Sequence, residues 1–328
     1  MTRGRLALTA LGIALSTLAI VAMLHAVKAA DVWVHLRATR IAWLMAGMGV
    51  TILGYVFRAY RWRALLSPQR EIPIGRVFGP TVVGFLAINT LPARIGEFVR
   101  AYLLARLERL PAAAVLGSCV LERVLDLVLL ASVWVVLLFV APLPEWFRVS
   151  GYVTFGLGGL IVAALWLFQA RGHHAERYLD SGPMAALPLR VRDGIRRAIP
   201  AFGEGLRALG APGVLVKAGA WSVAMWLCSA LGFLAIGYAA GLSIPIWSPL
   251  LLVFVVCVAI LLPSSPGFVG VMEAACVVAL SLLGVDGARG LAYGILYHLS
   301  QILPLIILGS YFAVRAHLRP ADLASPES

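Results

Sequence analysis

Hydrophobic segments follow one another along almost the whole chain and are separated by shorter polar connections. A helix needs about 20 predominantly apolar residues to cross the hydrocarbon core of a bilayer. The segments of suitable length are residues 6–25, 41–58, 112–141, 151–169, 214–240 and 288–314. This pattern predicts an all-α polytopic membrane protein with about six full transmembrane helices, in a single integral membrane domain covering residues 1–328.

Two further hydrophobic segments, 77–105 and 248–284, are broken near their centres, and their separate pieces are too short to cross a bilayer. Broken helical backbone at membrane depth must be buried in protein or line a water-filled cavity. We therefore expect two re-entrant helical hairpins. The alternative is a pair of full spans at each break, which would leave the other segments in the same orientation across the membrane. The interrupting residues are Asn89, Pro92 and Gly96 in the first segment and Pro263, Pro266, Gly267 and Gly270 in the second.

The arginines are unevenly distributed between the connections, in a chain whose formal net charge is +12. If segment 77–105 enters and leaves by the same face, most of the basic residues share one face of the membrane. These residues lie in the stretches 3–5, 58–76, 106–109, 171–217 and 315–319. The positive-inside rule makes that face cytoplasmic and places both termini there. The two hairpins then enter from opposite faces, which predicts an inverted repeat with halves 1–170 and 213–319.

Residues 171–212 form the one long polar stretch between the two halves. Within it, Ile195, Ile199 and Phe202 recur at intervals of three or four residues, and arginines occupy the positions between them. This spacing predicts an amphipathic helix in the cytoplasmic interface, which would link the halves. Residues 320–328 are predicted to be a short polar tail.

The composition limits the classes of function. With 61% hydrophobic and 13% charged residues, the chain is not an ordinary soluble domain. Because the arginines are spread over connections between spans, they suit anionic lipid headgroups, and we exclude nucleic acid as a partner. The four cysteines lie inside hydrophobic segments, without the spacing of a metal site or a disulfide framework. The sequence therefore predicts neither a metal nor a cofactor.

Several ionisable residues lie inside the hydrophobic segments. Each costs about 2.5–3.5 kcal/mol on insertion scales, which makes it a functional candidate by default. Arg94, Glu97 and Arg100 repeat every three residues and share a helical face, and Arg123 and Asp126 are spaced for an i,i+3 pair. The candidate substrate-binding residues are Arg94, Glu97, Arg100, Glu122, Arg123, Asp126 and Glu273.

The mixed signs of these residues allow two interpretations. In the first, opposite charges form ion pairs that fix the helix bundle. In the second, the arginines and the amide groups at half-helix starts hold a phosphate, while the carboxylates bind an amino headgroup or exchange protons. Glu273 has no basic neighbour in sequence, so it needs a distant partner, a proton or a substrate cation.

Three accessory candidates have simpler explanations beside the functional ones. Arg61 and Arg63 flank Trp62 after the second hydrophobic segment, and an interfacial anchor explains them better than substrate capture. His298, beside Tyr297 in the last segment, is either a proton carrier or a hydrogen-bonded packing residue.

Four short motifs, YRWRALL at 60–66, NTLPARIGEFVR at 89–100, ERVLD at 122–126 and PGFVGVME at 266–273, together carry a family resemblance. They resemble the transmembrane region of bacterial lysylphosphatidylglycerol synthases, also called the flippase-like domain family. The resemblance implies a multi-pass protein of a bacterial-type cell (inner) membrane that moves lipids between leaflets. It implies no aminoacyl transfer, because the sequence has no counterpart of the catalytic domain of the bifunctional members. His298 stands where the family often has arginine, so no role in the last segment is carried over.

We therefore expect a lipid flippase or transporter, rather than an enzyme, that moves a phospholipid or another lipid with an anionic or zwitterionic headgroup through a charged midplane cavity. The expected partners are membrane lipids and a lipid-synthesis enzyme. The alternatives are a membrane-embedded lipid-modifying enzyme and a scaffold for a lipid glycosyl- or aminoacyltransferase. Because the chain has no nucleotide-binding fingerprint, transport would follow an ion gradient or run downhill. The lipid, the direction, the coupling ion and the oligomeric state stay open.

Overall fold

A computed structural model of the chain describes residues 27–91, 95–145, 189–261 and 265–316, with scattered positions in 14–25 and 147–167. In these residues the regular secondary structure is helical, and no strand occurs among them. Several predicted features fall outside this part of the chain: most of segment 6–25, part of segment 151–169, residues 171–188, the polar tail, and the individual residues Pro92, Arg94 and Pro263.

Four described helices are long and apolar enough to cross a membrane: α3 (Ile41–Leu66), α6 (Ala112–Val140), α9 (Pro212–Ala239) and α12 (Gly287–Arg315). They coincide with four of the six predicted full spans. The largest difference is at α3, which continues eight residues beyond the predicted boundary at residue 58 and so contains Arg61, Trp62 and Arg63. The chain is an all-α, multi-pass membrane protein.

Both interrupted segments form a pair of shorter helices. The first pair is α4 (Ile74–Thr90) and α5 (Gly96–Glu108), and the second is α10 (Ser248–Ala259) and α11 (Val271–Ser281). A single turn of 3-10 helix, η4 (Pro266–Phe268), precedes α11. Gly267 and Gly270 both have a positive φ, of 74° and 85°, which postpones the regular helix until Val271.

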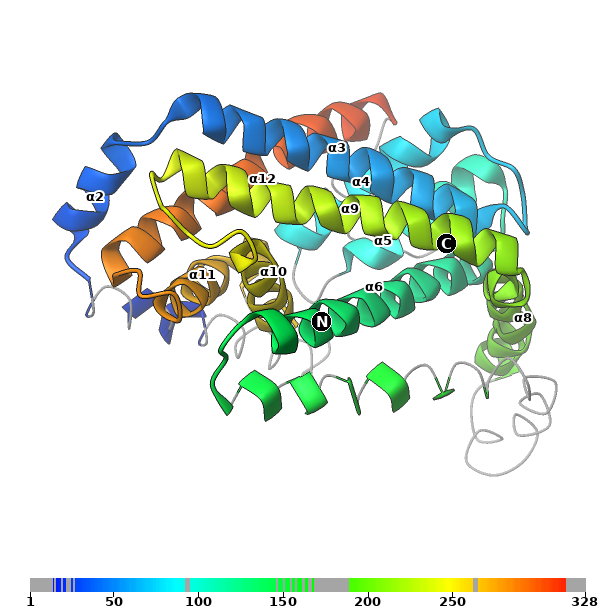
Figure 1. Cartoon of the computed structure of the whole chain (residues 1–328). Coiled ribbons are helices and arrows are strands. Elements are labelled where there is room, and N and C mark those ends of the chain that lie inside the picture. The colour runs from blue at the N-terminus through cyan, green and yellow to red at the C-terminus, as the bar shows by residue number, and fades with distance from the viewer. Residues whose placement is uncertain are drawn as a thin grey trace.

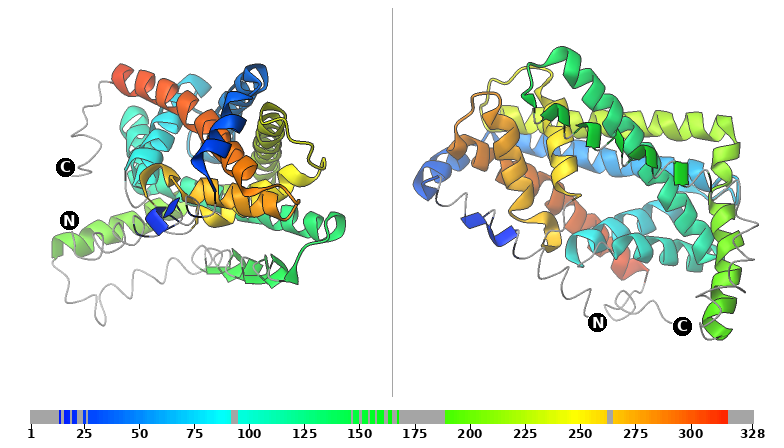
Figure 2. Two further views of the ribbon diagram at one scale, coloured as in Figure 1. Left: turned by 90° about the vertical axis from the view of Figure 1, so that its left-hand side faces the viewer. Right: turned by 90° about the horizontal axis from the view of Figure 1, so that it is seen from below.

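The two helix pairs occupy opposite halves of the long axis of the bundle. At one end, which also carries α2 (Ala29–Arg37), the Arg40 amide donates to the Ala239 carbonyl and joins the start of α3 to the end of α9. At the other end lies α8 (Leu189–Gly205). Figures 1 and 2 show α10 and α11 in the half nearer α2, and α4 and α5 in the half nearer α8. α2 has only nine residues and is too short to cross a bilayer.

The broken ends of the two pairs meet inside the bundle. A Cβ atom placed on Gly267 would lie 3.6 Å from the carbonyl oxygen of Asn89, the penultimate residue of α4. Of the seven residues predicted to interrupt the helices, Asn89 lies within the last turn of α4, whereas Gly96 is the first residue of α5. Pro266, Gly267 and Gly270 lie in the connection between α10 and α11.

The predicted amphipathic helix is present as α8, followed by a turn of 3-10 helix, η3 (Arg207–Gly210). It runs across the end of the bundle, transverse to α6 and α9 (Figures 1 and 2). Its last residue, Gly205, lies against Gly117 and the Ala114 carbonyl of α6, where a Cβ atom would overlap the backbone. The absence of side chains at Gly117 and Gly205 therefore lets α8 approach α6 closely.

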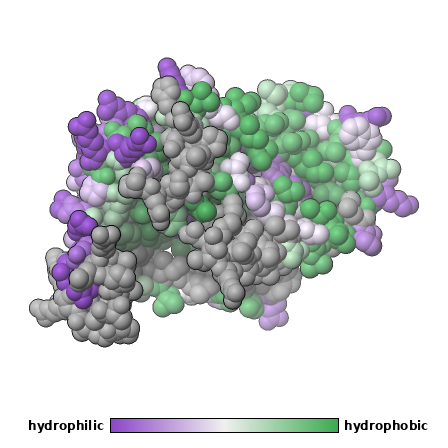
Figure 3. All heavy atoms as spheres, turned by 180° about the vertical axis from the view of Figure 1, so that it is seen from behind, coloured by the Kyte–Doolittle hydropathy of each residue, from purple (hydrophilic) through white to green (hydrophobic). Residues whose placement is uncertain are grey.

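The molecular surface has the distribution expected of a membrane protein. Hydrophilic residues gather at the two ends of the long axis, and hydrophobic residues cover the zone between them on the face drawn in Figure 3. Large apolar side chains such as Phe139, Val216 and Ile307 are more than two-thirds exposed. Water would disfavour so much contiguous apolar surface, and lipid chains cover it instead.

Candidate functional site

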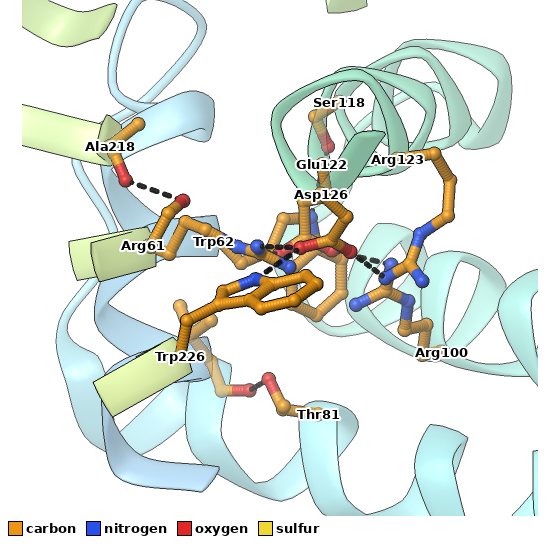
Figure 4. A network of polar contacts seen from close by, with 12 residues as sticks. Arg61, Trp62, Thr81, Arg100, Ser118, Glu122, Arg123, Asp126, Ala218 and Trp226 are labelled. Carbon is orange, nitrogen blue, oxygen red and sulfur yellow. Dashed lines mark hydrogen bonds and ion pairs between the residues drawn. The ribbon is translucent and has the colours of Figure 1, made fainter. Parts of the chain in front are cut away.

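Six charged side chains from α3, α5 and α6 form a closed ring in which positive and negative groups alternate. We call it the ionic ring. Each guanidinium touches two carboxylates, and each carboxylate touches two guanidinium groups. In order around the ring, the members are Arg61, Glu122, Arg100, Glu97, Arg123 and Asp126. Figure 4 labels every member of this ring except Glu97.

One edge of the ionic ring is fully buried. Glu122 Oε1 lies 3.2 Å from Arg61 Nε, and Glu122 Oε2 lies 2.5 Å from Arg100 Nη2. None of these three side chains is more than 1% exposed. The positive charges of Arg61 and Arg100 on either side of Glu122 thus compensate a carboxylate that has no access to solvent.

The opposite edge is accessible. Arg123 Nε lies 3.6 Å from Glu97 Oε1, and Arg123 Nη2 lies 3.2 Å from Asp126 Oδ2. The side chains of Arg123, Glu97 and Asp126 are 42%, 23% and 18% exposed. Contacts of 2.6 Å from Arg100 to Glu97 and 2.5 Å from Arg61 to Asp126 join this accessible edge to the buried one.

The break between α4 and α5 places the ionic ring near the middle of α6, away from both ends of that helix. Because α5 begins at Gly96, Glu97 lies in its first turn, where the positive end of the helix dipole favours a carboxylate. A Cβ atom on Gly96 would overlap the Gly84 carbonyl of α4, so this glycine lets the two helices meet closely. Asp126 stands midway along α6, about 21 Å from each end at a rise of 1.5 Å per residue.

Aromatic side chains hold the buried arginine of α5. The Arg100 guanidinium lies 4.9 Å from the centre of the Trp62 ring and 5.6 Å from that of Phe85. The Trp62 indole N–H donates to Ser118 Oγ at 3.0 Å, which fixes the ring against α6. From α9, the Trp226 indole N–H donates to Asp126 Oδ1 at 3.4 Å. Side chains of α3, α4, α5, α6 and α9 therefore meet at or beside the ionic ring.

The ring retains capacity for an anion. Arg61 Nη2 and Arg100 Nε are buried donors without a hydrogen-bond partner among the described residues. Arg58, one turn before Arg61, lies over the Phe85 ring at 4.8 Å and interacts electrostatically with Asp126, but the described carboxylates form no ion pair with it. Counting Arg58, four positive groups face three negative ones. The cluster therefore has a formal charge of +1.

A second buried pair lies in the other half of the molecule. His298 Nδ1 of α12 is 2.6 Å from Glu273 Oε1 of α11, and Glu273 Oε2 accepts the Gly270 N–H at 2.7 Å. Glu273 and His298 are each 8% exposed, and His298 Nε2 has no hydrogen-bond partner in the described part of the chain. The distant partner that Glu273 needed is thus a residue 25 positions later in the sequence.

The structure brings five of the seven predicted site residues together, namely Glu97, Arg100, Glu122, Arg123 and Asp126. Glu273 lies apart, in α11 of the second helix pair. The explanation of Arg61 as an interfacial anchor is wrong, because Arg61 and Trp62 are fully buried and Arg61 belongs to the ring. Arg63 is separate from the site, and its Nε donates to the Ile72 carbonyl at 2.8 Å. Among the described residues, no group of three or more His, Cys, Asp or Glu side chains is placed to hold a metal ion.

Comparisons with known proteins agree with the position of these elements. A family model described as the lysylphosphatidylglycerol synthase TM region matches residues 9–309, a range that contains both helix pairs, the ionic ring and the Glu273–His298 pair. A comparison with curated proteins found no match.

Proposed function

Because the chain belongs to the lysylphosphatidylglycerol synthase TM region family, we propose that it is a lipid transporter. Its substrate would be a phospholipid, or another lipid with an anionic or zwitterionic headgroup, that moves between the two leaflets. The chain itself would catalyse no change in the lipid. The observation that carries this proposal is the ionic ring, which has one sealed edge and one accessible edge at mid-depth of the bundle.

The accessible edge needs a polar neighbour. Arg123 is 42% exposed beside the middle of α6, where a bilayer would surround the protein with hydrocarbon. An arginine at the centre of a membrane costs about 2.5–3.5 kcal/mol on insertion scales, and much more in simulations of an isolated helix. Water or a lipid headgroup at this edge removes that cost. We infer that the headgroup enters here while the acyl chains stay in the bilayer.

A zwitterionic headgroup can replace contacts within the ionic ring without reducing the number of ion pairs. Its phosphate would take the place of a carboxylate beside Arg123, and its ammonium group would bind the released carboxylate of Glu97 or Asp126. Charge-assisted contacts would replace charge-assisted contacts, so the barrier to opening the ring falls. The formal charge of +1 contributed by Arg58 would favour an anionic group over a cationic one.

We propose the following topology. The α4–α5 pair would be a re-entrant hairpin from the cytoplasmic face, and the α10–α11 pair would be its inverted counterpart from the opposite face. The end that carries α8 would be cytoplasmic, with both termini. Arg70 and Arg76 support this orientation, since both contact Glu108 at the α8 end. The α2 end has fewer basic residues, namely Lys28, Arg37, Arg40, Arg148 and Arg289.

A leaflet-resolved transport assay in proteoliposomes tests the function. Fluorescent phosphatidylglycerol and phosphatidylethanolamine would be placed in both leaflets, and the outer label would be quenched chemically with time. We expect wild-type protein to add a transport phase that Arg123→Ala and Glu97→Gln each slow by at least about tenfold. Arg289→Ala is the matched control, because Arg289 forms an exposed i,i+3 pair with Asp286 away from the ring.

Two results would contradict the proposal. Transport at the wild-type rate by both ring variants would remove the ionic ring from the function. A chemically altered lipid, detected by mass spectrometry after incubation with purified protein, would instead identify a lipid-modifying enzyme.

A further inference from the structure

We propose that Glu273 and His298 form a proton-binding site in the second hairpin, and that the proton bound at His298 Nε2 accompanies lipid movement. The existence of the site is independent of the proposed function. The coupling of the proton to lipid movement rests on it.

The contacts of Glu273 determine where the imidazole carries its hydrogen. One carboxylate oxygen accepts the Gly270 amide at 2.7 Å, and the other lies 2.6 Å from His298 Nδ1. The backbone amide aimed at this carboxyl group favours its ionised form. Beside an ionised Glu273, a neutral His298 carries its hydrogen on Nδ1 and donates it to the carboxylate, which leaves Nε2 with a free lone pair.

The other imidazole nitrogen is placed to take up a proton. His298 Nε2 is buried and has no hydrogen-bond partner among the residues that the structure describes. With a neutral imidazole the pair carries one negative charge, and with a second proton it is electrically neutral. Burial penalises the net charge and favours the proton, whereas the new N–H would have no acceptor, which opposes it. The lone pair of Nε2 is therefore the position at which the pair can bind a second proton.

Titratable and charged groups from α3, α10, α11 and α12 lie in the neighbourhood of the pair. Thiol and phenol groups are neutral near pH 7, so among the neighbouring groups that the structure describes only Arg58 is charged there. Arg58 interacts electrostatically with both Tyr297 and Asp126, and so connects the neighbourhood of this site with the ionic ring. The neighbouring titratable or charged groups are Cys276 on α11, Cys257 on α10, Tyr55 and Arg58 on α3, and Tyr293 and Tyr297 on α12.

A proton at this site also acts on the helix break. Glu273 caps the first turn of α11 through Gly270, and Gly294 of α12 packs against the Glu273 backbone. The connection that Glu273 caps contains Gly267, which lies against the carbonyl of Asn89 at the end of α4. A protonated His298 attracts the Glu273 carboxylate more strongly and weakens its hold on the Gly270 amide. The charge state of the pair therefore influences the contact between the two hairpins.

Nitrogen NMR of the full chain in lipid nanodiscs tests proton binding without any transport. With ¹⁵N-labelled histidine, the signals absent from His298→Gln are those of His298. We expect them to report one protonation step, with the second proton taken up at Nε2. In Glu273→Gln the step moves to lower pH by at least one unit, because the anion that stabilises the imidazolium is gone, while the glutamine oxygen can still cap Gly270. His35→Gln, at the exposed α2 helix, is the control and leaves the step unchanged. A His298 signal that keeps one charge state from pH 4.5 to 9 overturns the site.

Transport under an imposed pH gradient tests the coupling. The wild-type rate of lipid movement is expected to change at least threefold when the gradient is reversed, and this dependence disappears in His298→Gln and Glu273→Gln. Lipid transport that ignores the gradient overturns the coupling but leaves the proposed function intact. A titrating His298 in a protein that moves no lipid refutes the transport function and keeps the proton site.

Discussion

The buried edge of the ionic ring should contribute stability that the accessible edge does not. The sharpest perturbation is Glu122→Gln, which preserves the size of the side chain and removes one negative charge. Glu122 is the shared partner of Arg61 and Arg100 at 3.2 and 2.5 Å, and all three side chains are buried. After the substitution, two guanidinium groups would face a neutral amide in the protein interior.

The magnitude follows from what remains around the two cations. Removing one partner of a buried ion pair costs about 3–5 kcal/mol, because an uncompensated charge is left behind. Arg61 keeps Asp126 and Arg100 keeps Glu97, each within 2.6 Å, so we expect the lower limit of that range. A loss of about 3 kcal/mol corresponds to roughly a 100-fold change in the unfolding equilibrium constant.

A double-mutant cycle separates charge balance from packing. In Glu122→Gln/Arg100→Gln, Arg61, Asp126, Arg123 and Glu97 remain as a neutral chain of alternating charges. The double variant should therefore be about 1–2 kcal/mol more stable than the sum of the single effects predicts.

Equilibrium unfolding in mixed micelles, followed by tryptophan fluorescence, measures these differences in the free energy of unfolding. The control is Glu204→Gln, since Glu204 pairs with Arg207 at an exposed site and its loss should cost no more than about 1 kcal/mol. The reasoning is refuted if Glu122→Gln is as stable as this control, or if the two substitutions in the ring are simply additive.

Three further outcomes follow from close contacts. Gly96→Ala should destabilise the protein by about 1–3 kcal/mol, because the new Cβ atom overlaps the α4 backbone. Gly75→Ala, with open space around it, should be neutral or slightly stabilising. The same unfolding assay measures both variants, and equal effects would contradict the close packing of Gly96 against α4. Gly205→Ala should loosen α8 from α6 and accelerate tryptic cleavage at the arginines of α8, but Gly203→Ala, which has no neighbour within 4 Å, should not. Trp62→Phe removes the indole hydrogen bond to α6 and should cost about 0.5–1.5 kcal/mol of unfolding free energy; an unchanged stability would show that this bond adds nothing.

Much of the helical organisation could be predicted because its causes are local. Hydrophobic length predicted four of the long helices, and proline and glycine predicted the positions of both breaks. The start of α11 at Val271 is not evident from composition, because Gly267 and Gly270 both have positive φ, and composition alone does not distinguish a glycine in a turn from one inside a helix. The end of α3 was placed too early because Arg61 and Arg63 have the composition of an interface, although Arg61 is neutralised inside the bundle.

The candidate site was predictable only within single helices. Spacing of three residues correctly predicted the contacts of Glu97 with Arg100 and of Arg123 with Asp126. The contacts of Arg61 with Glu122 and Asp126 join residues 61 and 65 positions apart, and no local pattern connects them. The one available signal was the presence of unpaired arginines beside a hydrophobic segment.

The sequence by itself determined that this chain is a multi-pass helical membrane protein of a known family, with two broken segments and too many charges for hydrocarbon, because these properties depend on local length and composition. Only the tertiary structure decided how the charges are balanced: as a ring with one sealed and one accessible edge, and as a separate Glu273–His298 pair. Ion pairs depend on distances of a few ångströms between helices, and those distances arise from the packing of the whole bundle.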